Sequence, residues 1–255
     1  MTSKASWSIY TTSMKKINSS SLSILNGDKF TIMSKNHFVL FSNIKGGIGK
    51  SSLCTLFAHY LTAKGEDVAV IDADIQRTIA RQRTRDKESR PDDKLPWEVY
   101  SIFDYNDKGE IEKLLPVLKE QDGWILVDCP GNMEVERLIP VFQAADSVVI
   151  PTTYGDNDLD ATVELFVPVL RQINETAKLI FAPNRINESK AQFKEEAKRN
   201  RDKAWNKVHT YGSLVARIKD SIVFDNSRFN TIDPLNHWQA NGVMHCFDEI
   251  YKELK

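Results

Sequence analysis

A stretch of ten residues combines the side chains and the backbone freedom needed to bind a polyphosphate. Residues 43–52 read NIKGGIGKSS, after a short apolar run and before a helical pattern. Glycines adopt positive φ readily, so such a loop can turn successive N–H groups toward an anion at the positive end of the next helix. In that setting Lys50 is expected to neutralise the β- and γ-phosphates of ATP, and the Ser51 hydroxyl to ligate Mg²⁺.

The loop departs from the strict P-loop pattern GxxxxGK[ST], which requires glycine where this chain has Ile44. It reads KGGxGKS instead, with a second lysine, Lys45, at its head. A glycine-rich turn with incidental lysines is the alternative interpretation. The residues predicted to bind ATP at this loop are Lys45, Gly46, Gly47, Ile48, Gly49, Lys50, Ser51 and Ser52.

Two acidic motifs also follow apolar runs. Asp72 and Asp74 come directly after VAVI, and Asp128 comes after WILV. Ligands of parallel sheets bind at the carboxyl ends of strands, and acids two residues apart on an extended chain point to the same side. The Asp128 pattern resembles a Walker B strand, so we expect Asp128 to hold Mg²⁺ through water or to orient Ser51. Taken alone, the Asp72–Asp74 pair could simply cap the next helix.

These motifs, in this order, resemble the ParA/MinD ATPases. KGGIGKSS is similar to their deviant Walker A motif, DADIQ to their DxDxQ segment with Ile75 in place of the common proline, and DCPGN at 128–132 to their switch segment. The resemblance implies an ATP-bound dimer in which Lys45 reaches the phosphates of the partner subunit. It also implies that Asp72 binds water on Mg²⁺ and that Asp74 orients the attacking water. The implied catalytic residues are Lys45, Lys50 and Asp74, and the implied metal set is Ser51, Asp72 and Asp128.

Two softer signals concern the base and the dimer face. FAPNR at 181–185 ends the last apolar run, and the resemblance implies that Asn184 contacts adenine beside Arg185, a candidate to stack on the ring. An ordinary strand-ending turn explains the same residues. Residues 151–160 resemble the stretch that precedes a helix on the family's dimer face, where Asp158 is equally well explained as a helix cap.

Short apolar runs alternate with helical stretches from residue 33 onward, which predicts an α/β fold: a doubly wound, mostly parallel sheet of the P-loop NTPase type. Strands are expected at 38–42, 68–71, 124–127, 147–150 and 179–182, with a further one at 97–102, and helices at 50–64, 76–87, 134–143, 159–176 and 189–209. We expect residues 33–255 to form a single ATPase domain. The Ser-rich residues 1–32 are expected to be a disordered tail or an overlong reading frame.

Composition limits the partners and the compartment. The 255 residues carry a formal net charge of -1, so any DNA contact must come from a local patch. No apolar run approaches the roughly 20 residues of a membrane span. The three cysteines, Cys54, Cys129 and Cys246, form no CxxC pair, which suits a reducing cytoplasm and predicts buried small hydrophobes.

Two helical stretches are basic, and the resemblance implies that such residues bind DNA without sequence preference once the dimer forms. It further implies an activating, ParB-like partner. Interleaved acids support the alternative of solvated helix faces with internal ion pairs. The basic residues are Arg77, Arg81, Arg83, Arg85, Lys87 and Arg90, then Lys194, Lys198, Arg199, Arg201, Lys203 and Lys207, with Arg217, Lys219 and Arg228 later.

The predicted function is that of a cytoplasmic ParA-like Mg-ATPase, nucleoid-associated when ATP-bound, that segregates a plasmid or mobile element. The alternatives are a same-fold ATP-controlled switch in conjugation, regulation or cargo positioning, a MinD-like membrane ATPase, and a metabolic P-loop enzyme. Acids in residues 246–255 oppose attachment to an anionic membrane, and Phe247, Ile250, Tyr251 and Leu254 have the spacing of a packed helix face. Cys54 and Cys129 are poorly placed for an iron–sulfur carrier.

Overall fold

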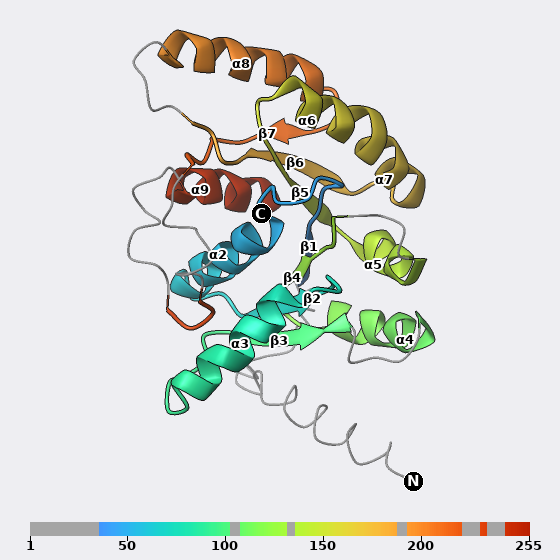
Figure 1. Ribbon diagram of the computed structural model, residues 1–255. Coiled ribbons are helices and arrows are strands. Elements are labelled where there is room, and N and C mark those ends of the chain that lie inside the picture. Colours follow the sequence, from blue (N-terminus) through green and yellow to red (C-terminus); the bar gives the residue numbers. More distant parts are fainter. Residues whose placement is uncertain (1–35, 103–107, 132–135, 188–192, 221–229, 234–242) are drawn as a thin grey trace, which may run out of the picture. The chain divides into compact units, whose positions relative to one another are not determined.

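The computed structural model describes residues 36–102, 108–131, 136–187, 193–220, 230–233 and 243–255, all of which belong to the unit Ser34–Lys255 (Figure 1). The predicted tail, the expected starts of the helices at 134 and 189, and Arg228 lie outside the described residues.

Seven parallel strands form one sheet in the order β3-β2-β4-β1-β5-β6-β7, which confirms the predicted fold class (Figure 1). From the central strand β1 the chain first builds toward β3 and later toward β7, so the direction of winding reverses beside β1. Ligands of such sheets bind at the carboxyl ends near this reversal. The strands are β1 Asn36–Phe41, β2 Val68–Asp72, β3 Glu98–Ser101, β4 Gly123–Asp128, β5 Ser147–Thr152, β6 Lys178–Pro183 and β7 Ser213–Leu214.

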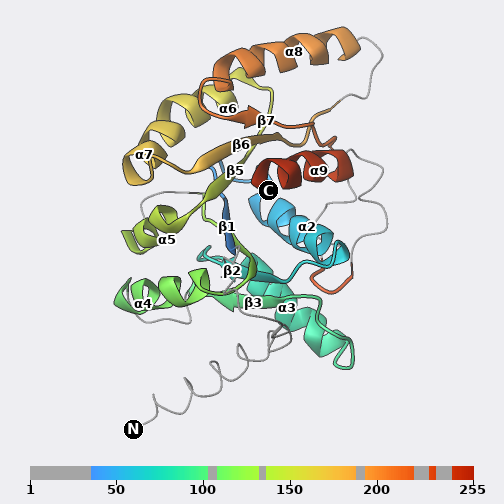
Figure 2. The same ribbon diagram turned by 180° about the vertical axis from the view of Figure 1, so that it is seen from behind.

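Helices cover both faces of the sheet. Two views related by a half-turn show α2, α3 and α9 on one face and α4, α5 and α7 on the other, with α8 beyond the β7 edge near α6 (Figures 1 and 2). The helices are α2 Lys50–Ala63, α3 Thr78–Ser89, α4 Lys108–Lys119, η2 Glu136–Leu138, α5 Ile139–Ala144, α6 Asp156–Asp160, the π-helical turn η3 Ala161–Phe166, α7 Val167–Ile173, α8 Phe193–Val208 and α9 Val243–Leu254.

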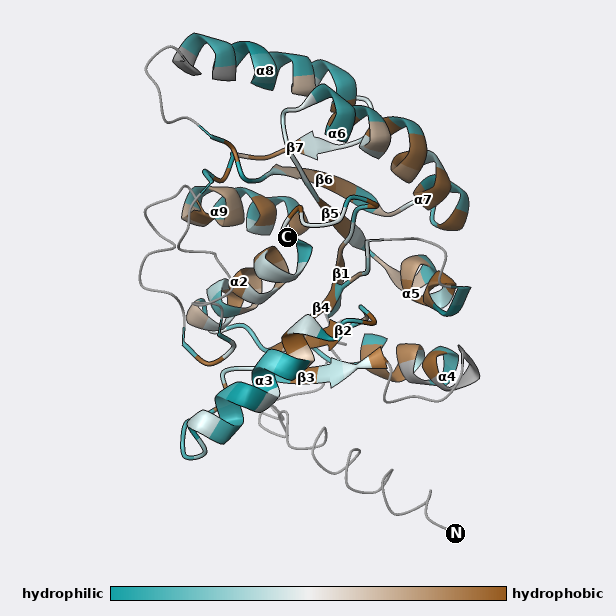
Figure 3. Ribbon diagram, viewed as in Figure 1, coloured by the Kyte–Doolittle hydropathy of each residue, from teal (hydrophilic) through white to brown (hydrophobic). Residues whose placement is uncertain are grey.

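The core lies between the strands and these helices. Phe57 of α2 is fully buried, and its ring lies 5.2 Å from that of Phe247 on α9 and 5.9 Å from that of Phe41 on β1. Hydropathy colouring shows apolar central strands and a mostly hydrophilic α8 (Figure 3). Phe247 and Ile250 are buried, so the expectation that the C-terminal helix packs on the domain is confirmed. Within the described part of the chain, every helix is too short or too polar to cross a bilayer.

Three elements differ from expectation. Helix α4 was not predicted, because Pro116 lies inside it and proline normally interrupts a helix. It forms nonetheless, since Ile111, Leu115 and Leu118 share one buried face at helical spacing. The helix expected from 159 begins at Asp156 and contains the π turn. Strand β7 was missed because two residues carry no periodic signal.

Candidate functional site

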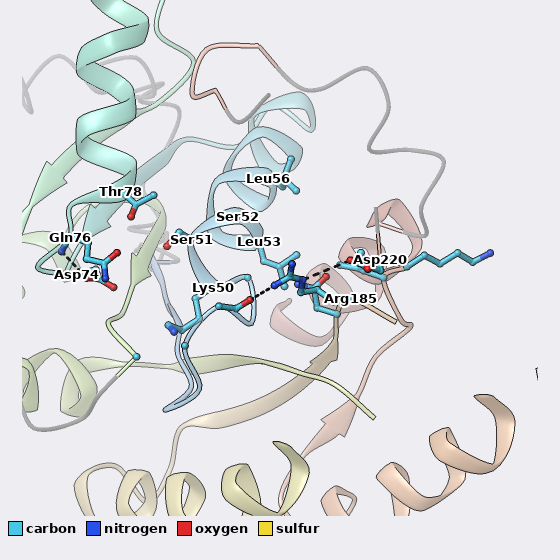
Figure 4. A pocket seen from close by; sticks show the side chains of 17 residues that line it. Lys50, Ser51, Ser52, Leu53, Leu56, Asp74, Gln76, Thr78, Arg185 and Asp220 are labelled. Atoms are coloured by element: carbon cyan, nitrogen blue, oxygen red, sulfur yellow. Dashed lines mark hydrogen bonds and ion pairs between the residues drawn. The ribbon is translucent and has the colours of Figure 1, made fainter. Parts of the chain in front are cut away.

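A cavity of about 580 Å³ opens at the carboxyl end of the sheet, between the loop after β1, the start of α3 and the end of β6 (Figure 4). The predicted loop residues line one wall, and residues beyond β7 line the opposite one. The lining residues are Gly46, Gly47, Gly49, Lys50, Ser51, Ser52, Leu53, Leu56, Asp74, Gln76, Thr78, Gly131, Asn184, Arg185, Ile218, Lys219 and Asp220. Ile48 and Lys45 do not line it.

The glycines of the loop are required by its backbone. Gly47 and Gly49 have φ of 68° and 96°, in the region that favours glycine. A Cβ on Gly49 would lie 2.3 Å from Nδ2 of Asn184, so no side chain fits there. Gly49 is also the residue before α2, whose first turn contains no acid and has no side-chain cap. The N–H groups that begin this helix are therefore available to an anion.

Lys50 is the first residue of α2, and its ammonium folds back over the loop. Nζ donates to the carbonyl of Lys45 at 3.0 Å, and a Cβ on Gly131 would lie 3.5 Å from it. Burial lowers the pKa of Lys50, and the carboxylates of Asp128 and Asp74 oppose that shift. A buried ammonium that gains a phosphate partner recovers the solvation it has lost, which suits the predicted role.

Asp128 ends β4 and is fully buried beside this lysine. Neither carboxylate oxygen has a well-formed hydrogen bond among the described residues. Burial raises the pKa of Asp128 well above its ordinary value, and the Ser51 hydroxyl and the Lys50 ammonium offset only part of that effect. Buried acceptors without donors fit a water molecule held on Mg²⁺, which keeps several waters and takes few protein ligands.

Asp72 and Asp74 do different things. Asp72 lies opposite Asp128 in the strand register, but its carboxylate accepts hydrogen bonds from the amides of Ala80 at 2.9 Å and Asp74 at 3.2 Å. It therefore caps the start of α3, the alternative left open by the sequence. Asp74 lines the cavity and accepts from the amide of Gln76 at 2.8 Å. The strand ends at Asp72 and a turn begins at Asp74, so the extended geometry on which the sequence argument depends ends between the two acids.

Lys45 is held at the edge of the site by an acid. Its Nζ lies 3.2 Å from Oδ1 of Asp158, and both side chains are about one-third exposed. Asp158 lies inside α6, whose preceding residue is Gly155, and its other oxygen accepts from the Thr153 hydroxyl at 2.7 Å. This ion pair cannot be predicted from the sequence, because no spacing rule connects residues so far apart in the chain.

The head of the loop is also anchored to the π turn. Nδ2 of Asn43 donates to the carbonyl of Pro151 at 2.8 Å and to the hydroxyl of Thr162 at 3.0 Å. Thr162 lies in η3 and donates in turn to the carbonyl of Asp158 at 2.7 Å. π turns are frequent at functional sites, and here the turn aims a hydroxyl at the residue that begins the loop.

Asn184 and Arg185 contact the loop rather than open space. Nδ2 of Asn184 donates to the carbonyl of Ile48 at 2.9 Å, and Nη1 of Arg185 donates to the carbonyl of Gly47 at 2.6 Å. Nε of Arg185 also lies 3.8 Å from Oδ1 of Asp220. Both residues line the cavity, but the wall formed by Leu53, Leu56 and residues 218–220 was not predicted, because no motif marks it.

No group of metal-ligating side chains is found elsewhere in the described part of the chain. Among the described residues, no three or more His, Cys, Asp or Glu side chains gather as a metal site. Cys54, Cys129 and Cys246 are free and buried, which confirms their predicted packing role.

The basic stretch on α3 is only partly available to a partner. Arg83 is 6% exposed, because its guanidinium donates to the carbonyl of Trp97 at 2.6 Å and to Thr231. Arg90 is paired with Asp233 and Asp93. The expectation that Arg83 contacts DNA is therefore corrected, because its guanidinium is buried against Trp97 and Thr231; Arg90 is about one-third exposed and is tied to Asp93 and Asp233.

Helix α8 retains more of its charge for a partner. Lys207 is paired with Asp160 of α6 at 2.5 Å and Asp156 at 3.3 Å, so this lysine ties α8 to the domain instead. The side chain of Lys194 lies outside the described residues. Four cations on α8 are exposed and have no ion pair among the described residues: Lys198, Arg199, Arg201 and Lys203.

A parallel, doubly wound sheet with a glycine-rich loop at the cavity defines a nucleotide-binding α/β domain of the P-loop NTPase type. Residues 39–223 match the CobQ/CobB/MinD/ParA nucleotide binding domain, so the chain belongs to this family. No curated protein sequence matches it.

Solved structures share the fold at low identity. A plasmid partition protein from Borrelia burgdorferi is 15% identical, with a TM-score of 0.58 over 86% of this chain and 99% of that one. Apo McdA from Cyanthece is 14% identical, with a TM-score of 0.64 over 87% and 100%. The septum site-determining protein MinD from Pyrococcus horikoshii OT3, complexed with Mg-ADP, is 17% identical, with a TM-score of 0.62 over 87% and 96%.

Proposed function

We propose that the chain is an ATPase that binds Mg-ATP at the loop of residues 43–52 and dimerises on it. The observation that carries this proposal is that Lys50 and Ser51 line one cavity and Asp128 is buried beside them, with carboxylate oxygens that lack well-formed donors. Family membership and the solved relatives support it.

Each residue has a defined task in the proposed reaction. The amides at the start of α2 and the Lys50 ammonium bind the phosphates, and the Ser51 hydroxyl with Asp128 would hold Mg²⁺, directly and through water. Mg²⁺ supplies neutralisation of charge on the β- and γ-phosphates. Asp74, at the cavity wall, would orient the attacking water. Asp72 lies beside Asp128 in the strand register. In this proposal it would also bind a water molecule held on Mg²⁺.

Dimerisation would use Lys45. Its ammonium is at the edge of the loop, outside the cavity lining, and its ion-pair partner among the described residues is the partly exposed carboxylate of Asp158. A cation in that position gains more from a triphosphate on a facing subunit than from Asp158, because phosphate carries greater charge. ATP would thus join two copies of the chain.

We propose that the ATP-bound dimer binds DNA, and the surface of α8 is the observation that favours this. Its exposed cations Lys198, Arg199, Arg201 and Lys203 offer phosphate contacts without base recognition. In this proposal the protein is nucleoid-associated when ATP-bound, an activating ParB-like partner accelerates hydrolysis, and the cycle segregates a plasmid or mobile element. The buried apolar face of α9 disfavours the membrane-bound alternative.

Light scattering of the protein with ATP, ADP or no nucleotide, each with and without random duplex DNA, tests the proposal. We expect a dimer only with ATP, and DNA binding only by the dimer, with affinity falling steeply as salt rises. Lys45→Ala should bind ADP and remain a monomer with ATP. An intact ATP dimer of Lys45→Ala would contradict the role of this lysine.

The second candidate is an ATP-controlled switch of the same fold that does not use DNA. The paired Arg83, Arg90 and Lys207 favour it, because they reduce the basic surface that the sequence predicts. An ATP-dependent dimer that ignores DNA at low salt would establish this candidate. Turnover that requires a small metabolite and no dimer would instead indicate a metabolic enzyme.

A further inference from the structure

Two consecutive residues directly after β6 hold two consecutive carbonyls of the phosphate loop. Asn184 donates to the carbonyl of Ile48 at 2.9 Å, and Arg185 donates to that of Gly47 at 2.6 Å. Asn184 is buried, and its amide nitrogen occupies the space that a Cβ on Gly49 would need. Figure 4 shows Arg185 between the loop and Asp220. The contacts therefore fasten the middle of the loop to the opposite wall of the cavity.

Fixing a carbonyl also fixes the next amide. A peptide unit is planar and trans, so its C=O and N–H point in opposite directions. When the carbonyls of Gly47 and Ile48 are held by β6, the N–H groups of Ile48 and Gly49 must point away from the side chains that hold them. Neither N–H makes a well-formed hydrogen bond to an acceptor among the described residues. Two amides with a set direction and no well-formed partner are what an anion nest requires.

The backbone of Arg185 adopts an unfavourable conformation, which indicates that its contact with the loop is maintained at a cost in conformational energy. Its φ of 58° lies in the left-handed region, which residues with a side chain seldom adopt. Such a conformation persists where the surroundings hold it. Here the guanidinium is held from two sides, by the carbonyl of Gly47 and by the carboxylate of Asp220 at 3.8 Å.

We propose that Asn184 and Arg185 are positioning residues for the phosphate loop, and that they set its amides for a polyphosphate chain whatever base is attached. The role differs from the adenine contact that the resemblance implies for Asn184. It rests on the proposed function, because it takes the cavity to be a nucleotide site.

Binding of inorganic tripolyphosphate, which has no base, separates the two roles. Isothermal titration calorimetry would compare tripolyphosphate and ADP on the full chain and on Arg185→Ala. We expect both affinities to fall by the same factor of about ten, the effect of one charge-assisted hydrogen bond. Arg185→Lys keeps a cationic donor and should recover part of the loss for both ligands. Asp220→Asn should give a smaller but equally shared loss.

A matched control is Arg171→Ala. Arg171 also donates from its guanidinium to backbone carbonyls, at 2.7 Å for Ala177 and 2.8 Å for Glu175, but it does not line the cavity. We expect this variant to lose thermal stability and to keep both affinities. If Arg185→Ala does not fold, the affinities of Arg185→Lys and Asp220→Asn for the two ligands test the inference instead.

Three results would overturn the inference: a loss for ADP alone, no loss for either ligand, or a wild-type chain that binds ADP and ignores tripolyphosphate. The first would show that Arg185 contacts the base or ribose. A wild-type chain that binds neither ligand would instead contradict the proposed function.

Discussion

Replacing Asp158 with asparagine should strengthen the ATP-dependent dimer. In the proposed dimer Lys45 must leave Asp158, whose Oδ1 lies 3.2 Å away, with side chains 35% and 33% exposed. A pair this exposed is worth about 0.5 kcal/mol. A symmetric dimer releases two lysines, so the change removes a cost of about 1 kcal/mol and should lower the dimer Kd about fivefold. Asparagine still offers an acceptor to the Thr153 hydroxyl, so α6 should keep its start.

Sedimentation velocity with a non-hydrolysable ATP analogue would measure this change. The matched control is Asp156→Asn, which removes an equal charge from the same helix but pairs with Lys207 at 3.3 Å instead of Lys45. We expect Asp156→Asn to dimerise like the wild type. An Asp158→Asn dimer no tighter than the wild type, or an equal gain in both variants, would refute the idea that Asp158 competes for this lysine.

Three further changes test the site and the core. Lys50→Ala should abolish ADP binding in calorimetry, because it removes the buried cation of the loop; an unchanged Kd would contradict that role. Burial lowers the pKa of His59 to about 4, so protonation favours the unfolded chain. Between pH 6.5 and pH 4 the free energy of unfolding should fall by about 3 kcal/mol more for the wild type than for His59→Phe in urea titrations, and parallel curves would disprove it. Phe247→Ala should cost about 3–5 kcal/mol of unfolding free energy, since its ring is fully buried, whereas a loss below about 1 kcal/mol would show that α9 is not part of the core.

Local patterns in the sequence were sufficient to predict the sheet and the phosphate loop. Buried parallel strands are short apolar runs, because both faces are covered by helices, and β4 and β6 extend each predicted run by only a residue at either end. The features of the loop also lie close together in the sequence. Within a few residues it has two glycines that adopt positive φ, Gly47 and Gly49, a lysine and a hydroxyl.

What the sequence could not show depends on contacts between distant segments. Arg83 looks like any other arginine of a basic helix, yet it is buried because Thr231 and Trp97 bring acceptors to it. Asp72 belongs to a motif that suggests metal binding, and its second role, accepting a hydrogen bond from the start of α3, depends on the turn after β2. Charge and spacing in the sequence identify such residues as candidates for binding a ligand. Which of them are free to bind one depends on the residues that contact them in the fold.

Among the described residues, three groups of contacts tie the phosphate loop to the rest of the domain, and these differ in strength. Asn43 is buried against η3, and the carbonyls of Gly47 and Ile48 are held from β6. Lys45 is bound by a pair worth about 0.5 kcal/mol, comparable to thermal energy. The loop is therefore fixed where it must present amides to phosphate, and loose at the one side chain that the proposed dimer needs to move. A ligand that offers Lys45 more than Asp158 does will shift that side chain without disturbing the nest, because the ties that hold the nest lie elsewhere.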